Sequence, residues 1–233
     1  MILFEEENDF LKGALMLVDK HYGWTSFDVV NKIRLSLRHR YPKLKVGHAG
    51  TLDPLATGLV IVCTGKWTKR IDEYMGKMKE YVAELNFGAT TPSFDMETAV
   101  NKEYPYLHVD KLLLSEVIQK FTGNIEQVPP SFSAIKVNGQ RAYRKARQGV
   151  ELAMEPRKIY VSDIEITNLQ LPKAELRINC SKGTYIRSLA NDIGQACGSG
   201  AYLSALRRTA IGEFQIKNAL NLEKLVVLLQ QNI

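Results

Sequence analysis

The chain has 233 residues, with 31 basic and 25 acidic side chains that give a formal net charge of +6. This length fits one large domain or two small ones, and 45% hydrophobic residues is ordinary for a soluble globular protein. No stretch approaches the roughly 18 apolar residues of a membrane span, and the acidic run Glu5-Glu6-Glu7 is unlike a signal peptide. We therefore expect a cytoplasmic protein that does not contact membranes.

The cysteines and histidines do not form a metal-binding pattern. Three cysteines are odd in number and widely spaced, without a Cys-x-x-Cys pair: Cys63, Cys180 and Cys197. This usage is typical of reduced thiols. The four histidines are isolated as well. We expect a protein that works without a metal or another cofactor.

The first elements are a strand and a helix. The strand covers Leu15–Val18, and a helix is predicted from about Phe27 to Arg38, capped by Thr25 or Ser26. The apolar positions expected on one face of this helix are Phe27, Val30, Ile33 and Leu37.

The segment Gly47–Gly58 is the most informative part of the chain. It holds three glycines, one proline, one histidine and a single carboxylate, Asp53, and it leads directly into the apolar strand Leu59–Cys63. An aspartate before a proline in such a loop is most often turn chemistry, with the carboxylate capping a backbone amide. A catalytic carboxylate displayed on a rigid loop is the functional alternative. The loop is not a nucleotide-triphosphate site, because Gly65-Lys66 is followed by Trp67.

The remaining elements alternate irregularly between helix and strand. Lys79–Phe87 has the two-residue period of a half-buried strand, with Tyr81 among its apolar positions. Asp110 is expected to cap a helix that runs to Phe121. The other expected elements are helix Thr68–Met75, basic helix Gln140–Gln148, paired strands Lys158–Gln170 and Ala174–Ser181, helix Tyr185–Ala196 and helix Leu222–Gln230. With no repeat or linker, this order predicts one α+β domain over residues 1–233 with a mixed sheet.

Basic residues gather in three segments with aromatics nearby: Lys32–Lys45, Arg141–Arg147 and Arg207-Arg208. Cations meet phosphates and aromatic rings stack on bases, so this pattern favours a looped or single-stranded RNA partner. A solvated helix face is the alternative.

Several segments together resemble one family. They are Gly47–Gly58, Lys79–Tyr81, Pro129–Lys136, Cys180–Arg187 and Leu206–Arg208. In this order they are similar to the TruB-type bacterial tRNA pseudouridine-55 synthases, and the likeness covers nearly the whole chain. The resemblance implies the pseudouridine synthase fold, a mixed and mainly antiparallel sheet with peripheral helices around a central RNA-binding cleft. It also implies a monomer.

The resemblance implies a known reaction. Family members convert one uridine of the tRNA T-loop to pseudouridine, without cofactor or metal, after the base leaves its stack. Asp53 matches the family's essential carboxylate, which either attacks the sugar or assists a glycal intermediate. One carboxylate is enough because the detached base is retained, whereas a glycosidase normally uses two.

Further site residues follow from the same resemblance. Tyr81 would stack on the flipped base, Tyr185 would be an active-site aromatic that takes the C5 proton, and Arg187 matches the arginine that pairs with the carboxylate. The expected RNA-contacting or pocket residues are Lys20, His48, Leu206, Arg141, Arg144 and Arg208. The alternative for each is an ordinary core or surface residue.

The sequence departs from the family pattern at three places. Pro92 replaces the first acid of a Thr-Asp-Thr-x-Asp stretch, so that only Asp95 remains, and His21 stands where proline is usual. Only 25 residues follow Arg208, so we expect the appended RNA-binding domain of the PUA type to be absent.

Two alternatives remain open at this stage. The first is the same chemistry on a different RNA stem-loop. The second is a non-catalytic RNA-binding or RNA-folding protein that keeps the pocket. A pure binder would tolerate Asp53→Asn, and a synthase acting on the tRNA T-arm would not.

Overall fold

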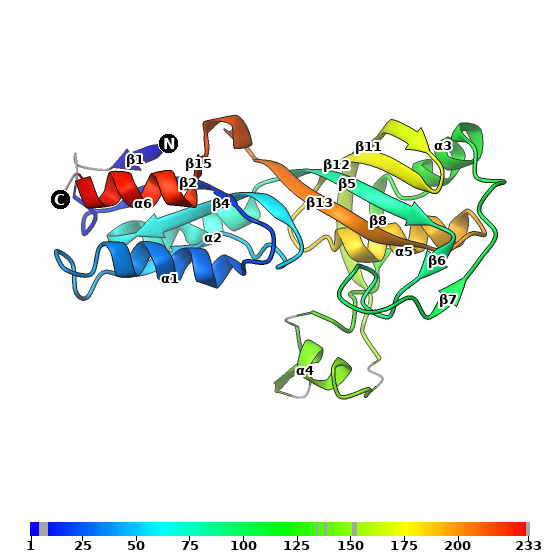
Figure 1. Cartoon of the computed structure of the whole chain (residues 1–233), viewed down its shortest axis with the longest axis horizontal. Coiled ribbons are helices and arrows are strands. Elements are labelled where there is room, and N and C mark those ends of the chain that lie inside the picture. Colours follow the sequence, from blue (N-terminus) through cyan, green and yellow to red (C-terminus); the bar gives the residue numbers. More distant parts are fainter. Residues whose placement is uncertain (5–8, 134, 138, 151–152, 232–233) are drawn as a thin grey trace. The chain divides into compact units, whose positions relative to one another are not determined.

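The structure is a computed structural model that describes residues 1–4, 9–133, 135–137, 139–150 and 153–231. The chain divides into two compact units (Figure 1): unit 1 contains Met1–Tyr81 and Leu206–Ile233, and unit 2 contains Val82–Ala205. Strands β5 (Lys79–Phe87) and β13 (Ala201–Ile211) have residues in both units. The expectation of one domain stays a prediction.

Unit 1 is built on a mixed sheet. Its own strands are β1 (Ile2–Phe4), β2 (Ala14–Lys20), β3 (Val46–His48), β4 (Thr57–Thr64), β14 (Phe214–Gln215) and β15 (Leu220–Asn221). The strand β2 pairs antiparallel with β1 and β4, and β3 pairs antiparallel with β4. The end of β13 pairs parallel with β4, and β15 pairs parallel with β2. The expected mixed sheet is confirmed.

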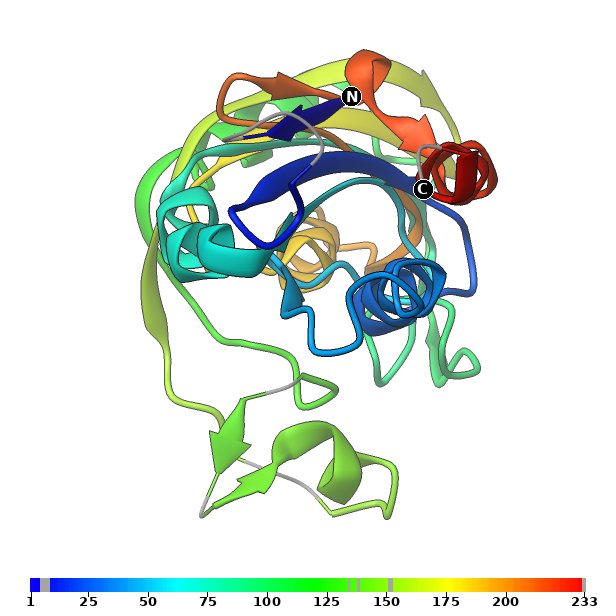
Figure 2. The ribbon, with the colours of Figure 1, turned by 90° about the vertical axis from the view of Figure 1, so that its left-hand side faces the viewer.

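The helices of unit 1 are α1 (Ser26–Ser36), the 3₁₀ helix Gly65–Arg70, α2 (Ile71–Gly76), the 3₁₀ helix Ile216–Asn218 and α6 (Leu222–Gln231). Helix α6 lies beside α1 (Figure 2). Thr25 caps α1 by a reciprocal pair of bonds: its Oγ1 accepts from the Asp28 amide at 3.0 Å, and the Asp28 carboxylate accepts from the Thr25 amide at 2.8 Å.

One expectation about α1 is wrong. Val30, Ile33 and Leu37 are buried as the sequence predicts, but the Phe27 side chain is 60% exposed. At about 100° per residue, Phe27 lies about 120° around the helix from Ile33, outside the buried stripe.

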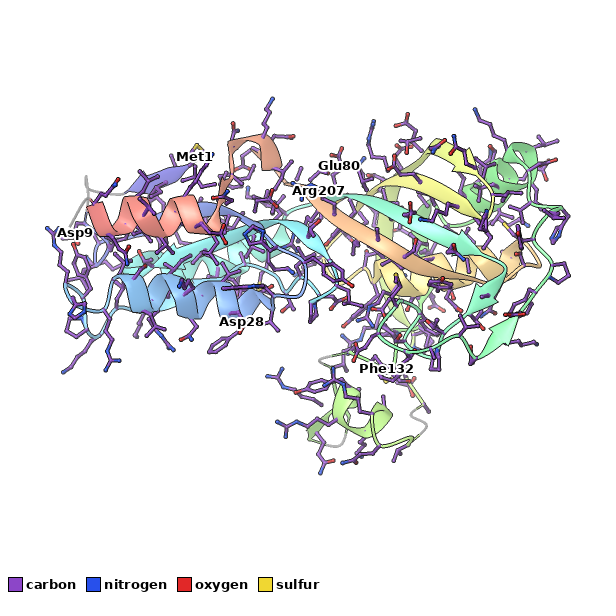
Figure 3. The ribbon with its side chains drawn as sticks, viewed as in Figure 1. Met1, Asp9, Asp28, Glu80, Phe132 and Arg207 are labelled. Atoms are coloured by element: carbon purple, nitrogen blue, oxygen red, sulfur yellow. The ribbon has the colours of Figure 1, made fainter. Side chains whose placement is uncertain are left out.

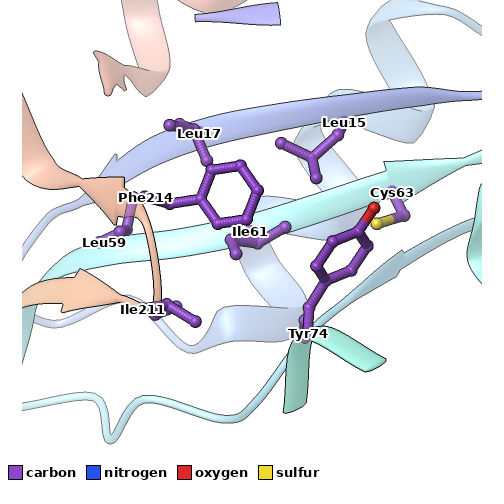
Figure 4. Close-up of a cluster of buried hydrophobic side chains, with 9 residues drawn as sticks. Leu15, Leu17, Leu59, Ile61, Cys63, Tyr74, Ile211 and Phe214 are labelled. Atoms are coloured by element: carbon purple, nitrogen blue, oxygen red, sulfur yellow. The ribbon is translucent and has the colours of Figure 1, made fainter. Parts of the chain in front are cut away.

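The core of unit 1 lies against β2 and β4 (Figure 4). It joins Leu15, Leu17, Ala49, Leu59, Ile61, Cys63, Tyr74, Ile211 and Phe214. The rings of Tyr74 and Phe214 meet edge to face, with centroids 5.9 Å apart, which is a favoured aromatic geometry. This packing makes β4 a rigid support for the loop that precedes it.

The described residues of unit 2 form a long antiparallel hairpin, shorter strands and helices. The strands are β6 (Ala89–Thr90), β7 (Lys102–Glu103), β8 (Gly123–Gln127), β9 (Lys136–Val137), β10 (Gln140–Arg141), β11 (Arg157–Gln170) and β12 (Lys173–Cys180). The helices are α3 (Lys111–Gln119), α4 (Ala142–Ala146) and α5 (Ile186–Ala196). The strand β11 pairs antiparallel with β12 and with β8.

Most predicted elements are confirmed, and the differences are of two kinds. Helix α4 is shorter than the predicted Gln140–Gln148, because its first two residues pair with β9 as strand β10. Strand β13 and several short strands, among them β1, β3 and β8, are absent from the prediction. Among the described residues, no helix is both long and apolar enough to cross a membrane.

Candidate active site

Asp53 lies in the loop between β3 and β4, in unit 1. The Asp53 carbonyl accepts a hydrogen bond from the Ala56 amide at 3.1 Å, which closes a tight turn with Pro54 in its second position. Leu52, just before Asp53, is buried in the core. The carboxylate therefore stands on a loop that is anchored on one side by an apolar side chain and on the other by a turn.

Arg208 supports the Asp53 loop through hydrogen bonds to backbone carbonyls. Its guanidinium, 1% exposed, donates from Nε to the Leu59 carbonyl at 2.7 Å, from Nη2 to Gly50 at 3.2 Å and from Nη1 to Thr51 at 3.4 Å. The sequence analysis expects Arg208 among the RNA-contacting or pocket residues, and in the structure its side chain is buried. Arg208 falls in the inward phase of β13, so its charge is turned into the protein and used by backbone carbonyls.

Lys20 is a second buried cation under the same loop. Its ammonium donates to the carbonyls of Pro54 and Ala56, and to Trp24 at 2.6 Å. Burial lowers the pKa of Lys20 to about 8, and the nearby negative charge of Asp53 opposes that decrease. Lys20 is thus a support of the Asp53 turn, where the sequence predicts an RNA-contacting residue.

A glycine makes this arrangement possible. Gly58 pairs with Arg208 in the parallel ladder between β4 and β13 at a φ of +110°. A Cβ added there would collide with the backbone carbonyl of Arg208. Only glycine lets the strand that follows Asp53 approach the strand that carries Arg208 this closely.

The other predicted residues of unit 1 occupy ordered strands. His48 ends β3, and burial lowers the pKa of its imidazole, which favours the neutral ring. Its Nδ1 is a buried atom without a hydrogen-bond partner in the described part of the chain. Tyr81 on β5 and Leu206 on β13 are both buried, and their place in a substrate pocket stays a prediction.

Arg187 is the central charged residue of unit 2. It lies in the first turn of α5, is 4% exposed, and donates to the Phe132 carbonyl at 2.9 Å and to Ser93 at 3.2 Å. Its Nε lies 3.6 Å from the Asp95 carboxylate. The ordinary alternative, a surface arginine on a helix, is therefore wrong.

Asp95 is a functional candidate that the sequence reasoning did not assign. It is buried, and its Oδ1 accepts from the Glu97 amide at 2.9 Å. Thr91 and Ser93 hydroxyls both donate to its backbone carbonyl. Pro92 lies in the tight turn that the Phe94 amide closes on the Thr91 carbonyl, so the substitution of the first acid leaves this loop ordered. The surviving acid in the Thr91–Asp95 stretch was the available signal.

Tyr185 is placed by a glutamine. It is the residue that precedes α5, and its backbone exchanges two bonds with the buried Gln127: the Tyr185 amide donates at 2.8 Å and its carbonyl accepts at 3.0 Å. Gln127 was not predicted as a site residue. Nothing in the sequence around it marks the role.

Arg141 and Arg144 are exposed around α4, and their contact with RNA phosphates stays a prediction. Both lie beside Tyr143, whose pKa is lowered by its bond to Arg144 and by the charge of Arg141.

A cavity of about 650 Å³ lies in unit 2 beside α4; its lining includes Pro92, Thr98, Ser131, Phe132 and Arg147. Among the described residues no group of three or more His, Cys, Asp or Glu side chains is placed to hold a metal ion.

Comparisons with known proteins identify the family. A family model described as TruB family pseudouridylate synthase (N terminal domain) matches residues 38–186, and one described as tRNA pseudouridylate synthase B C-terminal domain matches residues 187–232. The tRNA pseudouridine synthase B of Parabacteroides distasonis is 49% identical over 97% of both chains. That of Flavobacterium johnsoniae is 48% identical over 92% of this chain and 95% of the relative.

Solved structures agree with this assignment. A chain in the crystal structure of a Cbf5-Nop10-Gar1 complex has a TM-score of 0.70 and 27% identity, covering 97% of this chain and 63% of that one. A chain in an H/ACA RNP bound to a substrate RNA containing 2′-deoxyuridine has a TM-score of 0.67 and 26% identity, covering 97% and 62%. This chain thus spans somewhat less than two thirds of those solved chains. With the family models and relatives above, these likenesses show that the chain belongs to the TruB family of pseudouridylate synthases.

Proposed function

We propose that this protein converts the uridine at position 55 of the tRNA T-loop to pseudouridine, with Asp53 as the essential carboxylate. Family membership and the names of the relatives support the reaction and the class of substrate. The observation that carries the choice of Asp53 is its loop: a single carboxylate on a turn whose carbonyls are held by two buried cations.

The reaction explains why one carboxylate is sufficient. The N1–C1′ bond of the nucleotide breaks, the uracil turns without leaving, and C5 bonds to C1′ while the C5 proton departs. The sugar carbon becomes electron-poor when the first bond breaks, and an adjacent carboxylate stabilises it by attack or by charge. The retained base then supplies C5 as the atom that forms the second bond to C1′.

The remaining roles follow the family resemblance. Tyr81 is the platform for the flipped base and Tyr185 the aromatic that takes the C5 proton, and Arg187 matches the arginine that the family pairs with its carboxylate. Lys20 and Arg208 act by positioning the Asp53 turn. We assign phosphate contacts to the exposed Arg141 and Arg144, and not to the buried Arg208.

A tritium-release assay tests the substrate. A T-arm stem-loop carries tritium at C5 of its uridines, because pseudouridine and uridine have the same mass and only loss of the C5 label reports the exchange. We expect release of one label per stem-loop, and none when the target uridine is replaced by cytidine. Release from an unrelated stem-loop but not from the T-arm would contradict the proposed substrate. Tight binding without any release would contradict the proposed reaction.

A further inference from the structure

The turn between β2 and α1 is tied directly to the Asp53 loop. The Gly23 amide donates to the Pro54 carbonyl at 2.8 Å. The Ser26 hydroxyl accepts from the Leu52 amide at 2.9 Å and donates to the Leu52 carbonyl at 3.3 Å. Ser26 is the residue before Phe27, and Leu52 is the residue before Asp53. Phe27 and Asp53 therefore each directly follow a residue of the hydrogen-bonded pair Ser26 and Leu52.

Two aromatic side chains on this turn face solvent. Phe27 is 60% exposed and Tyr22 is 59% exposed. The capping box of Thr25 and Asp28 fixes the first turn of α1, from which Asp28 projects (Figure 3), so the Phe27 backbone is held in place while its ring stays uncovered. The Phe27 ring is exposed, its backbone is fixed, and the loop that carries Asp53 is hydrogen-bonded to the same turn. Another planar group can therefore stack on this ring.

The helix face that continues from Phe27 is polar and basic. Asn31 and Arg34 lie within about 40° of Phe27 around α1. Arg34 is exposed and donates to the Asn31 side-chain oxygen at 2.7 Å. Phe27 and Arg34 are about 10 Å apart along the helix axis, which is about three times the roughly 3.4 Å between successive nucleotides of one strand in a stacked duplex. An aromatic ring followed by a cation at this spacing is complementary to a base and a phosphate of one strand.

We propose that Phe27 stacks on an unpaired nucleotide adjacent to the flipped uridine, with Tyr22 flanking it, and that Arg34 contacts a phosphate of the same strand. The inference rests on the proposed function. When the target nucleotide leaves its stack, its neighbour loses a stacking partner, and an aromatic ring beside the catalytic loop replaces that partner. Phe27 thereby holds the substrate strand in register with Asp53.

Binding of the T-arm stem-loop tests the stacking. Phe27→Ala should weaken binding roughly 5- to 150-fold, the range measured for loss of one base–aromatic stack. Phe27→Trp should restore it, and Phe27→Leu, which keeps apolar area without a ring, should not. Leu35→Ala is the matched control, because Leu35 is also exposed on α1 but lies about 80° around the helix from Phe27. It should change binding less than twofold. All these side chains are exposed, so the variants should unfold at the temperature of the wild type.

Salt dependence separates the two contacts. Arg34→Ala should reduce the slope of log K against log salt by about 0.7 to 0.9, as expected for one lost phosphate contact, whereas Phe27→Ala should leave the slope unchanged. Wild-type affinity in Phe27→Ala, or full rescue by leucine, would overturn the stacking. An unchanged slope in Arg34→Ala would overturn the phosphate contact.

A second measurement distinguishes failure of this inference from failure of the proposed function. Tritium release by the wild type from the same stem-loop tests the proposed function independently of any Phe27 variant. Release by the wild type together with unchanged binding by Phe27→Ala would overturn this inference alone. Absence of release by the wild type would overturn the proposed function, and with it the inference.

Discussion

The two units hold their central charged residues in opposite ways. In unit 1 the residue of interest is an acid, Asp53. Two buried cations, Lys20 and Arg208, donate hydrogen bonds to the backbone carbonyls of its loop. In unit 2 the residue of interest is a cation, Arg187, and two backbone carbonyls with a buried carboxylate bind it directly. The acid is positioned through its backbone, and the cation through its side chain.

This difference has a chemical reason. Buried cations that bind backbone carbonyls fix the path of a loop, and with it the position of the side chain that the loop carries. A guanidinium has five N–H donors in one plane, so two carbonyls and a carboxylate can bind it together. Substitutions on each side measure the two kinds of support.

Loss of Arg187 should have the largest effect on stability. Arg187→Met leaves Asp95 buried without its ion-pair partner and the Ser93 and Phe132 carbonyls without this donor, so the free energy of unfolding should fall by about 3–5 kcal/mol. Arg177→Met is the control, because Arg177 pairs with Glu165 on the surface. It should cost less than about 1 kcal/mol in urea titrations. Equal losses in the two variants would contradict the burial argument.

Loss of Arg208 should come next, and its neighbour provides the comparison. Arg208→Met removes three bonds to backbone carbonyls, one buried and two partly buried, and should cost about 3 kcal/mol. Arg207→Met removes a partly exposed pair with Asp19 and should cost at most about 1 kcal/mol. Because Arg208 positions the Asp53 loop, its loss should lower kcat more than it raises KM. A change in KM alone would instead support the phosphate contact that the sequence predicts.

Gln127→Ala should have a moderate effect. It removes both bonds to the Tyr185 backbone and should cost about 2 kcal/mol in thermal unfolding. The exposed Gln119→Ala, on α3, should be close to neutral. A neutral Gln127→Ala would mean that α5 does not need this anchor.

Lys20 should leave a pH signature. Its pKa of about 8 in the folded protein lies below that of the unfolded chain, which therefore binds more protons between pH 8 and 10.5. The free energy of unfolding contributed by this group accordingly rises with pH across that window, by at most about 1.4 kcal/mol per unit. The difference between wild type and Lys20→Met should show this rise. A flat or falling difference would contradict the lowered pKa.

The sequence predicted elements with a regular period well. Strand β5 keeps its two-residue alternation from Lys79 to Phe87, and the predicted boundaries match. Strand β13 was not predicted, because its burial phase shifts around Ala205 and because Arg208 then occupies an inward position that looks like basic surface. Phe27 is the reverse case, an apolar residue near a buried stripe that faces solvent.

The supports of the site were beyond the reach of the sequence. Lys20, Arg208 and Arg187 bind backbone carbonyls, whose directions depend on the folded path of segments distant in the chain. Asp95 was visible as a surviving acid, but its pairing with Arg187 depends on the turn at Thr91–Phe94. Motifs predicted the candidate site residues, and the fold shows which charges support the loops that carry them.

The most direct test of the central claim is tritium release by Asp53→Asn. The substitution keeps the size of the side chain and removes its charge, so the variant should bind the T-arm stem-loop within a few-fold of wild type. We expect its single-turnover release to fall by at least about 10³-fold. Release within tenfold of wild type, at equal binding, would contradict the assignment of Asp53 as the essential carboxylate.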